Sequence, residues 1–289
     1  MAELEIITMG RVSVDLYPEQ IGIPLAEVKT FAKSLGGSAT NIVVAAARLG
    51  HGSAVITRVG DDGFGQYIRS ALEEFGVDPR FVSIDPELRT PLAFCEISPP
   101  DNFPLLFYRG PKAPDINIRT EDLDLEEISA APLFWMTGTG LSDEPSRSAT
   151  LAALKQRSGG STVFDLDYRP MLWKSRSETE RWYREALRHA TVAVGNQEEV
   201  AVAVGPGDPF EASAALLDLG LELALQTISE PLWSGIILGA PRKKRCRCPS
   251  ERTSKSRFPL SGALPTSRGR SSNRSSKSTI RPRAPVARA

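Results

Sequence analysis

Short apolar runs alternate along the chain with stretches whose apolar residues recur at helical spacing. The apolar runs end at glycine or at polar residues, which is typical of buried β-strands, and they lie at 4–10, 53–60, 133–140, 161–167 and 191–196. The stretches with helical spacing lie at 38–49, 66–77, 146–157, 178–190, 198–205 and 208–222. This alternation predicts βαβ units, and therefore an α/β fold with a mostly parallel sheet that helices cover on both faces.

Two segments do not follow this alternation. Residues 12–18, VSVDLYP, alternate with period two, and residues 91–110 have the pattern of a β-hairpin with a Pro/Asp/Asn turn. We expect lid segments near 11–25 and 90–110 to form a small separate sheet, since such flaps commonly close active sites. Arg109 ends the predicted hairpin. It can either cover a substrate or simply pack on the hairpin and keep its surface hydrated.

A glycine pair precedes the first predicted helix. Gly36 and Gly37 tolerate positive φ and let a ligand approach the backbone, while the helix that follows offers free N–H groups. Such a turn suits a polar or anionic ligand, and Asn41 lies in the first helical turn beside it. A tight strand-to-helix turn with a surface asparagine explains the same residues, and the sequence leaves both interpretations open.

Polar residues follow several predicted strands. In doubly wound sheets, ligands bind outside the carboxyl ends of the strands, so we expect Asp15, the glycine pair and the later strand ends to form one pocket. Arg169 follows Asp165 and Asp167 in FDLDYRP. Its guanidinium can clamp a carboxylate or phosphate, or form a local pair with an aspartate.

Asn196 and Glu199 lie three residues apart at the end of another strand. Their oxygens could hold Mg²⁺ directly or through water. The same spacing is that of a capping box, in which the asparagine begins a helix and the glutamate bonds back to it.

The charge is divided unevenly along the chain. Residues 1–240 carry 20 Lys and Arg against 34 Asp and Glu, whereas residues 241–289 carry 15 basic residues and a single acid, Glu251. The segment 228–289 is rich in Ser, Arg and Pro, so we expect a disordered basic tail after a domain at 1–227. A solvated charged segment is favoured over a nucleic-acid-binding arm.

Other features bear on location and on the class of protein. Three cysteines without a metal-binding or disulfide spacing, and no apolar run of membrane-spanning length, lead us to expect a cytoplasmic protein without a membrane partner. The sequence lacks G-x-x-x-x-G-K-[ST], G-x-S-x-G and H-E-x-x-H, and its histidines, His51 and His189, are far apart. A Ser-His-Asp hydrolase therefore has little support.

Six motifs occur in the order found in the ribokinase-like sugar kinases, the phosphofructokinase B family. They are GRVSVD, GGSATNIVVAAARLG, RVGDDGFGQYIRSALEEFGVD, TGTGLSDEPSR, FDLDYRPMLW and VGNQEEV. The combination most resembles the 5-dehydro-2-deoxygluconokinases of inositol catabolism, with the 2-keto-3-deoxygluconate kinases and fructokinases next. The resemblance implies a three-layer α/β sandwich with a β lid, and transfer of the γ-phosphate of ATP to a sugar with the help of Mg²⁺.

The resemblance also implies roles for individual residues. Asp15 would hold sugar hydroxyls, and Gly36, Gly37 and Asn41 would line the sugar pocket. Arg109 would reach the substrate from the lid and Arg169 would contact its acidic end. The pair that would organise Mg²⁺ and the phosphates is Asn196 and Glu199, with Glu199 as the metal-binding residue. The resemblance leaves a homo-oligomer open.

One family motif has no counterpart in this chain. The D-T-x-G-A-G-D signature, whose final Asp is the family's catalytic base, should follow N-x-x-E by several tens of residues, but the resemblance stops after Gln226. No catalytic base is therefore assigned, and we expect little phosphoryl transfer. We hypothesise a shifted reading frame downstream of codon 226, which the nucleotide sequence would test. A sugar-binding remnant without catalysis is the alternative to a kinase.

Overall fold

The structure is a computed structural model that describes residues 3–99, 102–228 and 234–239. All of these residues belong to the first of two structural units, residues 1–251. The second unit and most of the basic tail lie outside the described residues. Among the described residues, no helix combines the length and the apolar character needed to cross a bilayer.

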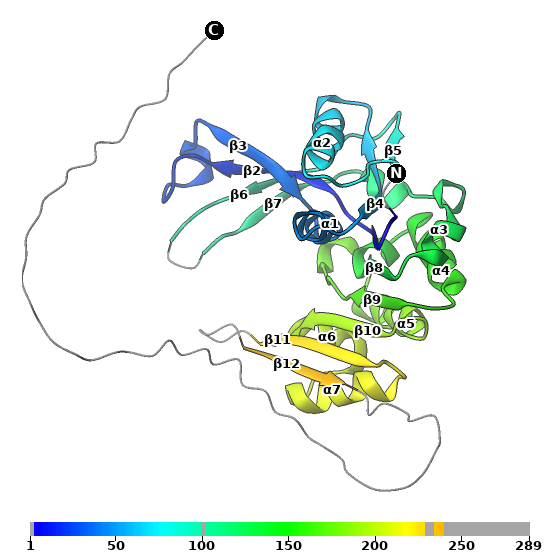
Figure 1. Ribbon diagram of the computed structural model, residues 1–289. Coiled ribbons are helices and arrows are strands. Elements are labelled where there is room, and N and C mark those ends of the chain that lie inside the picture. Colours follow the sequence, from blue (N-terminus) through cyan, green and yellow to red (C-terminus); the bar gives the residue numbers. More distant parts are fainter. Residues whose placement is uncertain (1–2, 100–101, 229–233, 240–289) are drawn as a thin grey trace, which may run out of the picture. The chain divides into compact units, whose positions relative to one another are not determined.

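An eight-stranded sheet forms the centre of the fold, with the order β12-β11-β10-β9-β8-β1-β4-β5 (Figure 1). Its strands are β1 (Ile6–Met9), β4 (Ser53–Gly60), β5 (Val82–Asp85), β8 (Leu133–Thr137), β9 (Ser161–Asp165), β10 (Val192–Asn196), β11 (Leu223–Ile228) and β12 (Ser234–Gly239). All neighbours pair in parallel except β11 and β12. The predicted α/β class and mostly parallel sheet are therefore confirmed.

Helices cover both faces of this sheet. Helices α1 (Ser38–Arg48) and α2 (Gly63–Glu74) share one apolar cluster with residues of β4, among them Val55 and Val59. The second cluster joins the other face to α3 (Leu125–Ala130), α4 (Ser146–Gln156), α5 (Arg176–Leu187), α6 (Gln197–Val204) and α7 (Pro209–Asp218). Successive residues of β4 enter opposite clusters because side chains alternate along a strand.

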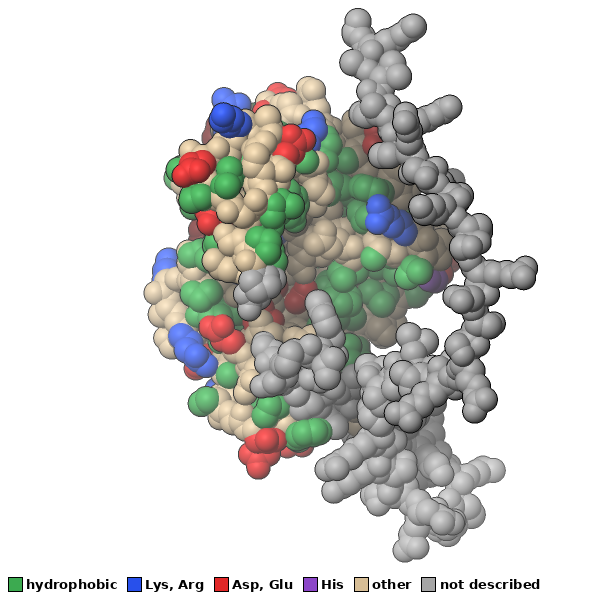
Figure 2. Space-filling view, turned by 90° about the vertical axis from the view of Figure 1, so that its left-hand side faces the viewer, with side chains coloured by type: hydrophobic (Ala, Val, Ile, Leu, Met, Phe, Trp, Pro, Cys, Tyr) green, Lys and Arg blue, Asp and Glu red, His purple; other side chains and the backbone are tan. Residues whose placement is uncertain are grey.

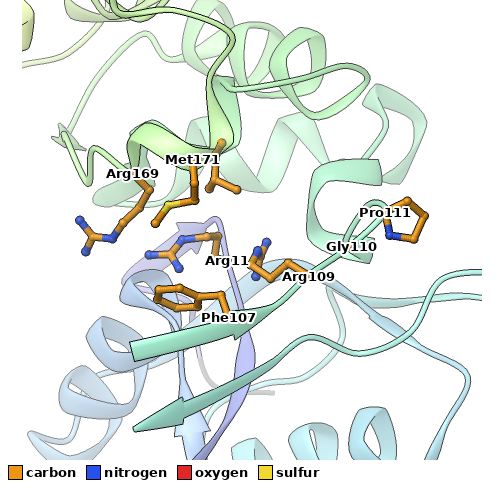
Figure 3. Close-up of a pocket in the computed structure, with 8 residues that line it drawn as sticks. Arg11, Phe107, Arg109, Gly110, Pro111, Arg169 and Met171 are labelled. Carbon is orange, nitrogen blue, oxygen red and sulfur yellow. The ribbon is translucent and has the colours of Figure 1, made fainter. Parts of the chain in front are cut away.

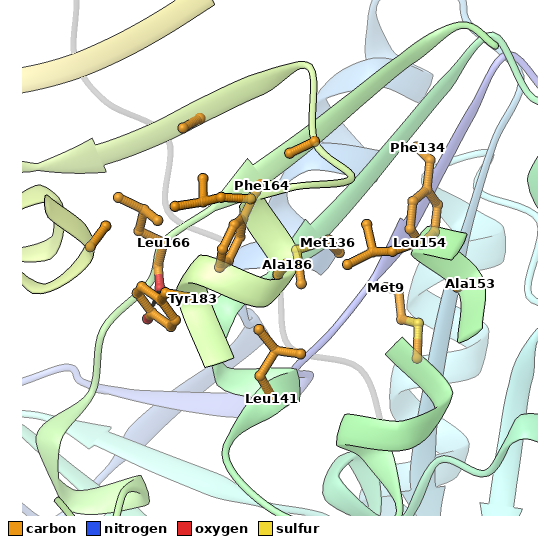
Figure 4. Close-up of a cluster of buried hydrophobic side chains, with 14 of the residues drawn as sticks. Met9, Phe134, Met136, Leu141, Ala153, Leu154, Phe164, Leu166, Tyr183 and Ala186 are labelled. Atoms are coloured by element: carbon orange, nitrogen blue, oxygen red, sulfur yellow. Dashed lines mark hydrogen bonds between the residues drawn. The ribbon is translucent and has the colours of Figure 1, made fainter. Parts of the chain in front are cut away.

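An aromatic group packs within the second cluster, and Figure 4 shows two of its members, Phe164 and Tyr183. The Tyr183 ring stands edge-on to Phe164 and Trp173, with centroid separations of 5.1 and 5.8 Å. Its hydroxyl donates to the carbonyl of Leu166, in the loop that follows β9. This contact fixes the backbone just before Asp167, so the apolar core holds a loop that reaches the site.

The predicted lid is a four-stranded sheet of order β3-β2-β6-β7. Strands β2 (Ser13–Pro18), β6 (Leu92–Cys95) and β7 (Leu105–Tyr108) confirm the two predicted segments, although part of the hairpin turn, residues 100–101, lies outside the described residues. Strand β3 (Phe31–Gly36) was not predicted. Three of its six residues in a row are exposed, so the sequence lacks the alternation of a half-buried strand.

Other differences from the sequence predictions have local causes. Helix α2 begins at Gly63 rather than near residue 66, because the Asp62 carboxylate accepts hydrogen bonds from Phe64 N and Gly65 N at 3.0 and 2.8 Å. The elements β5 and α3, of four and six residues, were not predicted. Strand β12 falls within the segment 228–289 that the sequence assigns to the tail, and it pairs antiparallel with β11; most of that segment lies outside the described residues.

Gly37 occupies a position that no other residue can fill without strain. Its φ is +106°, and a Cβ placed there would lie 2.2 Å from the Arg11 carbonyl oxygen. The close approach brings the first turn of α1 against the segment that joins β1 to the lid. Both the backbone conformation and the space therefore require glycine.

We predict that Gly37→Ala lowers the free energy of unfolding by roughly 3 kcal/mol or more, because it combines an unfavourable φ with a backbone collision. The matched control is Gly50→Ala, where φ is +92° but no atom lies within 4 Å of the added Cβ. That control should lose only about 1 kcal/mol. Equal losses in chemical denaturation would show that the close approach contributes nothing.

Candidate functional site

The site lies where the order of the sheet changes direction. From β1, the chain first builds outward through β4 and β5, and later returns to build β8 and the following strands on the other side of β1. A crevice forms outside the carboxyl ends of strands at such a switch point. Arg11 follows β1, Thr139 follows β8 and Asp167 follows β9, so three strand ends meet there.

A buried ion pair connects these strand ends. The Asp167 carboxylate accepts three hydrogen bonds of 2.8 to 3.2 Å from the Arg11 guanidinium. Thr139 Oγ1 donates to the same carboxylate at 3.2 Å and accepts from Arg11 Nε at 3.2 Å. Burial disfavours the charge on Arg11, but the adjacent Asp167 carboxylate outweighs that effect and raises the pKa of the guanidinium.

Asp167 adopts an unusual backbone conformation. Its φ is +33°, and it is the only non-glycine residue with positive φ in the described part of the chain. Such a conformation costs on the order of 1 kcal/mol and persists where surrounding contacts determine it. Here the contacts are the Arg11 pair on one side and an ion pair with Arg169, at 2.9 Å, on the other.

Arg169 links Asp167 to the helix after the next strand. Its Nη1 lies 3.3 Å from Glu199 Oε1, and the same nitrogen donates to the Tyr168 carbonyl at 2.9 Å. The side chain is 36% exposed, so its remaining donors face open space. Burial raises the pKa of Glu199 in spite of the neighbouring arginine. The local Asp–Arg pair considered from the sequence is therefore present, and the guanidinium is still accessible.

Asn196 and Glu199 form a complete capping box at the start of α6. Asn196 Oδ1 accepts from Glu199 N at 2.9 Å, and Glu199 Oε2 accepts from Asn196 N at 2.8 Å. Residues 3–99, 102–228 and 234–239 contain no group of three acidic, His or Cys side chains placed to hold a metal ion. The capping interpretation is confirmed, and a role of Asn196 and Glu199 in holding Mg²⁺ stays a prediction.

The glycine turn and the lid supply the opposite wall of the crevice. Asp15 projects from lid strand β2, and a Cβ on Gly36 would lie 2.0 Å from its Oδ1. Ser13 Oγ donates to that carboxylate at 2.7 Å, and burial raises the pKa of Asp15. Asn41 lies in the first turns of α1, where the sequence placed it, and it is exposed.

These residues line a hollow of about 400 Å³, which we call the acceptor hollow. Figure 2 shows acidic side chains inside a depression near the middle of that face of the molecule. Five of the residues predicted from the sequence line it together: Asp15, Gly37, Asn41, Arg169 and Glu199. Arg11, Ser13, Ser38, Ala93, Leu105, Phe107, Asp165 and Asp167 complete the lining.

A second hollow of about 260 Å³, the arginine hollow, adjoins the first and shares Arg11, Phe107 and Arg169 with it. Its remaining lining comes from Arg109, Gly110, Pro111, Met171 and Leu172. In Figure 3, Arg109 extends from the end of β7 toward Arg11, while Arg169 and Met171 come from the loop after β9. The Arg109 guanidinium is held by the fully buried Asp115 carboxylate.

Three predicted residues do not line the acceptor hollow. Gly36 lies against the Asp15 carboxylate without lining the hollow, and Arg109 lines only the arginine hollow. Asn196 lines a separate hollow of about 480 Å³ at the start of α6, with Gln197 and Glu198. Sequence reasoning also missed Arg11 and Ser38. Arg11 could have been suspected as a basic residue directly after a buried strand, but nothing in the sequence shows its partner, 156 residues away.

Among the carboxylates of the site, Asp165 has a strongly raised pKa. Burial, opposed by the hydrogen bond from Ser38 and reinforced by the charges of Asp167 and Glu199, raises its pKa from 3.8 to about 6. The folded protein therefore binds this proton more tightly than the unfolded chain does. Its contribution to stability is full below about pH 4 and is lost as the pH rises through 6.

We predict that Asp165→Asn removes this loss, because the amide has no charge to desolvate. The variant should gain about 2 to 3 kcal/mol of unfolding free energy relative to the wild type between pH 4 and pH 7. Denaturant unfolding at several pH values measures the difference. Asp61→Asn, which changes an exposed aspartate, serves as the control. Parallel wild-type and Asp165→Asn curves would contradict the assignment.

The chain shows extended similarity to proteins of the pfkB family. It matches the description "pfkB family carbohydrate kinase" over residues 3–228. It is 39% identical over 199 residues to a 5-dehydro-2-deoxygluconokinase of Geobacillus kaustophilus, and the matched segment covers 68% of this chain and 59% of that protein. A protein of the same name from Photobacterium profundum is 36% identical over 218 residues, covering 73% and 65%. The chain thus spans less than two thirds of these relatives.

Solved structures show the same architecture. A PfkB protein from Polaromonas superposes with a TM-score of 0.74 at 22% identity, covering 82% of this chain and 80% of that chain. A fructokinase from Vibrio cholerae with bound fructose, ADP and calcium has a TM-score of 0.68 at 25% identity, covering 82% and 74%. A sugar kinase from Pyrococcus horikoshii in complex with ATP has a TM-score of 0.65 at 24% identity, covering 82% and 76%. On this sequence match, supported by a ribokinase-like fold, the chain belongs to the pfkB family of carbohydrate kinases.

Proposed function

We propose that this chain binds a six-carbon sugar acid, 5-dehydro-2-deoxygluconate before others, as the phosphate acceptor of a pfkB-family kinase. The acid would span the two adjoining hollows, with its carboxylate in the arginine hollow and its hydroxyl end in the acceptor hollow. The observation that carries this proposal is the charge difference between two cavities that share a wall.

The arginine hollow is suited to a carboxylate. Arg11, Arg109 and Arg169 are the charged residues of its lining, and the lining includes no acidic side chain. Arg109 Nε is buried and has no acceptor among the described residues, so a ligand oxygen would satisfy an otherwise unpaired donor. Guanidinium groups bind carboxylates through paired, charge-assisted hydrogen bonds.

The acceptor hollow is suited to hydroxyl groups instead. Its lining has four carboxylates and two guanidinium groups, so it would repel the carboxylate of the ligand. The four acids are Asp15, Asp165, Asp167 and Glu199. A carboxylate only accepts hydrogen bonds, whereas a sugar hydroxyl can donate one. This difference orients a sugar acid in a single direction, with the hydroxyl tail toward Asp15 and Glu199.

ATP is the phosphate donor that family membership implies, and the Pyrococcus horikoshii relative was solved in complex with ATP. We assign its phosphates to the start of α6, where the helix dipole and first-turn N–H groups outside the capping box would favour anions. Mg²⁺ would then be bound mainly by the phosphates, because the capping box and Arg169 already occupy the side-chain oxygens of Asn196 and Glu199. On its cysteine pattern, we place the protein in the cytoplasm.

Phosphoryl transfer requires a group to accept the proton of the attacking hydroxyl. The sequence of 289 residues contains no G-A-G-D, the motif whose aspartate has this role in the family. We therefore propose sugar binding with little or no turnover by this chain. A 2-keto-3-deoxygluconate kinase is the nearest alternative, since its substrate is also an acid. A fructokinase is less compatible, because fructose would leave the arginine hollow without an anion.

Calorimetric titration of the full chain tests this proposal. We expect 5-dehydro-2-deoxy-D-gluconate to bind at least tenfold more tightly than D-fructose, because only the acid can satisfy the arginines. Arg169→Gln should remove that preference, and Arg176→Gln, at an exposed pair on α5, should retain it. ADP release measured in parallel with ATP and Mg²⁺ should stay near background.

Two results would contradict the proposal. Equal affinity for the acid and for fructose would show that the arginine hollow does not bind the carboxylate. Turnover at a rate of 1 to 100 s⁻¹, the usual range for kinases, would show that this chain has a catalytic base after all.

A further inference from the structure

The four carboxylates of the acceptor hollow fall into two classes. Asp167 and Glu199 are ion-paired with guanidinium groups. Asp15 and Asp165 have no ion pair among the described residues, and each is instead held by a serine hydroxyl. The serine-held carboxylates come from different parts of the fold, since Asp15 lies in the lid and Asp165 ends β9.

Ser38 sets the direction of the Asp165 carboxylate. It is the first residue of α1, directly after the glycine turn, and its Oγ donates to Asp165 Oδ2 across 127 residues of sequence. The hydrogen bond from Ser38 goes to Oδ2, while the buried Trp135 Nε1 lies near enough to lower the pKa of the carboxyl without making a hydrogen bond of normal geometry; Asp165 lines the acceptor hollow. One carboxylate oxygen is therefore fixed by the protein while the other remains available to a ligand.

This arrangement is unfavourable for the empty protein. The Asp165 carboxylate is mostly removed from water, with two further acids and one hydroxyl partner nearby. Its ionisation therefore lowers the stability of the folded protein. An asparagine of the same shape would avoid this loss. A ligand hydroxyl that donates to Oδ1 would offset this cost. The ionised aspartate is therefore favourable only when a ligand fills the hollow.

We propose that Asp165 is a specificity-determining residue, which accepts a hydrogen bond from a hydroxyl of the bound sugar acid opposite Asp15. The two serine-held carboxylates then select a hydroxylated tail, while the arginine hollow selects the carboxylate. This inference rests on the proposed function, because it assigns a contact within the same bound ligand. Ser38 is a positioning residue that acts through Asp165.

Other charged groups around the hollow have separate roles. Asp167 is held by Arg11 and Arg169, and Glu199 is held by Arg169 and the start of α6, so neither has the free geometry of Asp165. Asp15 faces the hollow from the lid strand β2. Arg11 and Arg169 contribute positive charge at the boundary with the arginine hollow.

The test compares 5-dehydro-2-deoxy-D-gluconate with hexanoate, an acid of equal carbon number without hydroxyl groups. Asp165→Asn in the full chain should weaken binding of the sugar acid roughly tenfold or more at pH 7.5 and leave hexanoate binding unchanged. Wild-type affinity for the sugar acid should fall as the pH drops below about 6, where Asp165 gains a proton, and the variant should lack that component. Ser38→Ala should weaken sugar-acid binding, and Ser38→Thr should restore it.

Each outcome decides between the two proposals. If Asp165→Asn binds both acids as the wild type does, the Asp165 assignment is overturned while the proposed function stands. If the variant loses affinity for both acids equally, its role is structural and the assignment is overturned as well. If the wild type does not bind the sugar acid, the proposed function fails and the assignment fails with it.

Discussion

The buried ion pair between Arg11 and Asp167 is the interaction on which the site depends. It joins the segment after β1 to the segment after β9, on either side of β8, at the point where the sheet order reverses. Both side chains are almost fully buried, so removing Asp167 would leave the Arg11 charge without an ionic partner, at a typical cost of about 3 to 5 kcal/mol, whereas Asp167 without Arg11 would keep its pair with Arg169. The pair also holds Asp167 at positive φ, which directs the following Arg169 into both hollows.

The ion pair lies between two cavities of different charge, since Arg11 lines both hollows and Asp167 lines only the acceptor hollow. Arg11 and Arg169 lie on the boundary, and the acids gather on one side of it. The lid contributes to both hollows, because Asp15 comes from β2 and Phe107 from β7. Movement of the lid would therefore change the shape and the charge of both hollows together.

Local patterns in the sequence were sufficient for much of the fold and for part of the site. The α/β alternation, the lid segments around VSVDLYP and the glycine turn all depend on neighbouring residues, and the structure contains each of them. Strand β3 and the Arg11–Asp167 pair were not predictable, because their stability comes from partners distant in sequence. Asn196 and Glu199 had two interpretations with identical spacing, and only the hydrogen bonds of the folded chain confirm the capping box. The family match ends near the point where the resemblance stops, at residue 228.

A crystal structure of the full chain with 5-dehydro-2-deoxy-D-gluconate would test the central claim most directly, because it shows which end of the acid each hollow holds. The account predicts the carboxylate within hydrogen-bonding distance of Arg109 and Arg169, and hydroxyl groups between Asp15 and Asp165. A sugar acid bound in the reverse direction, or outside both hollows, would contradict it.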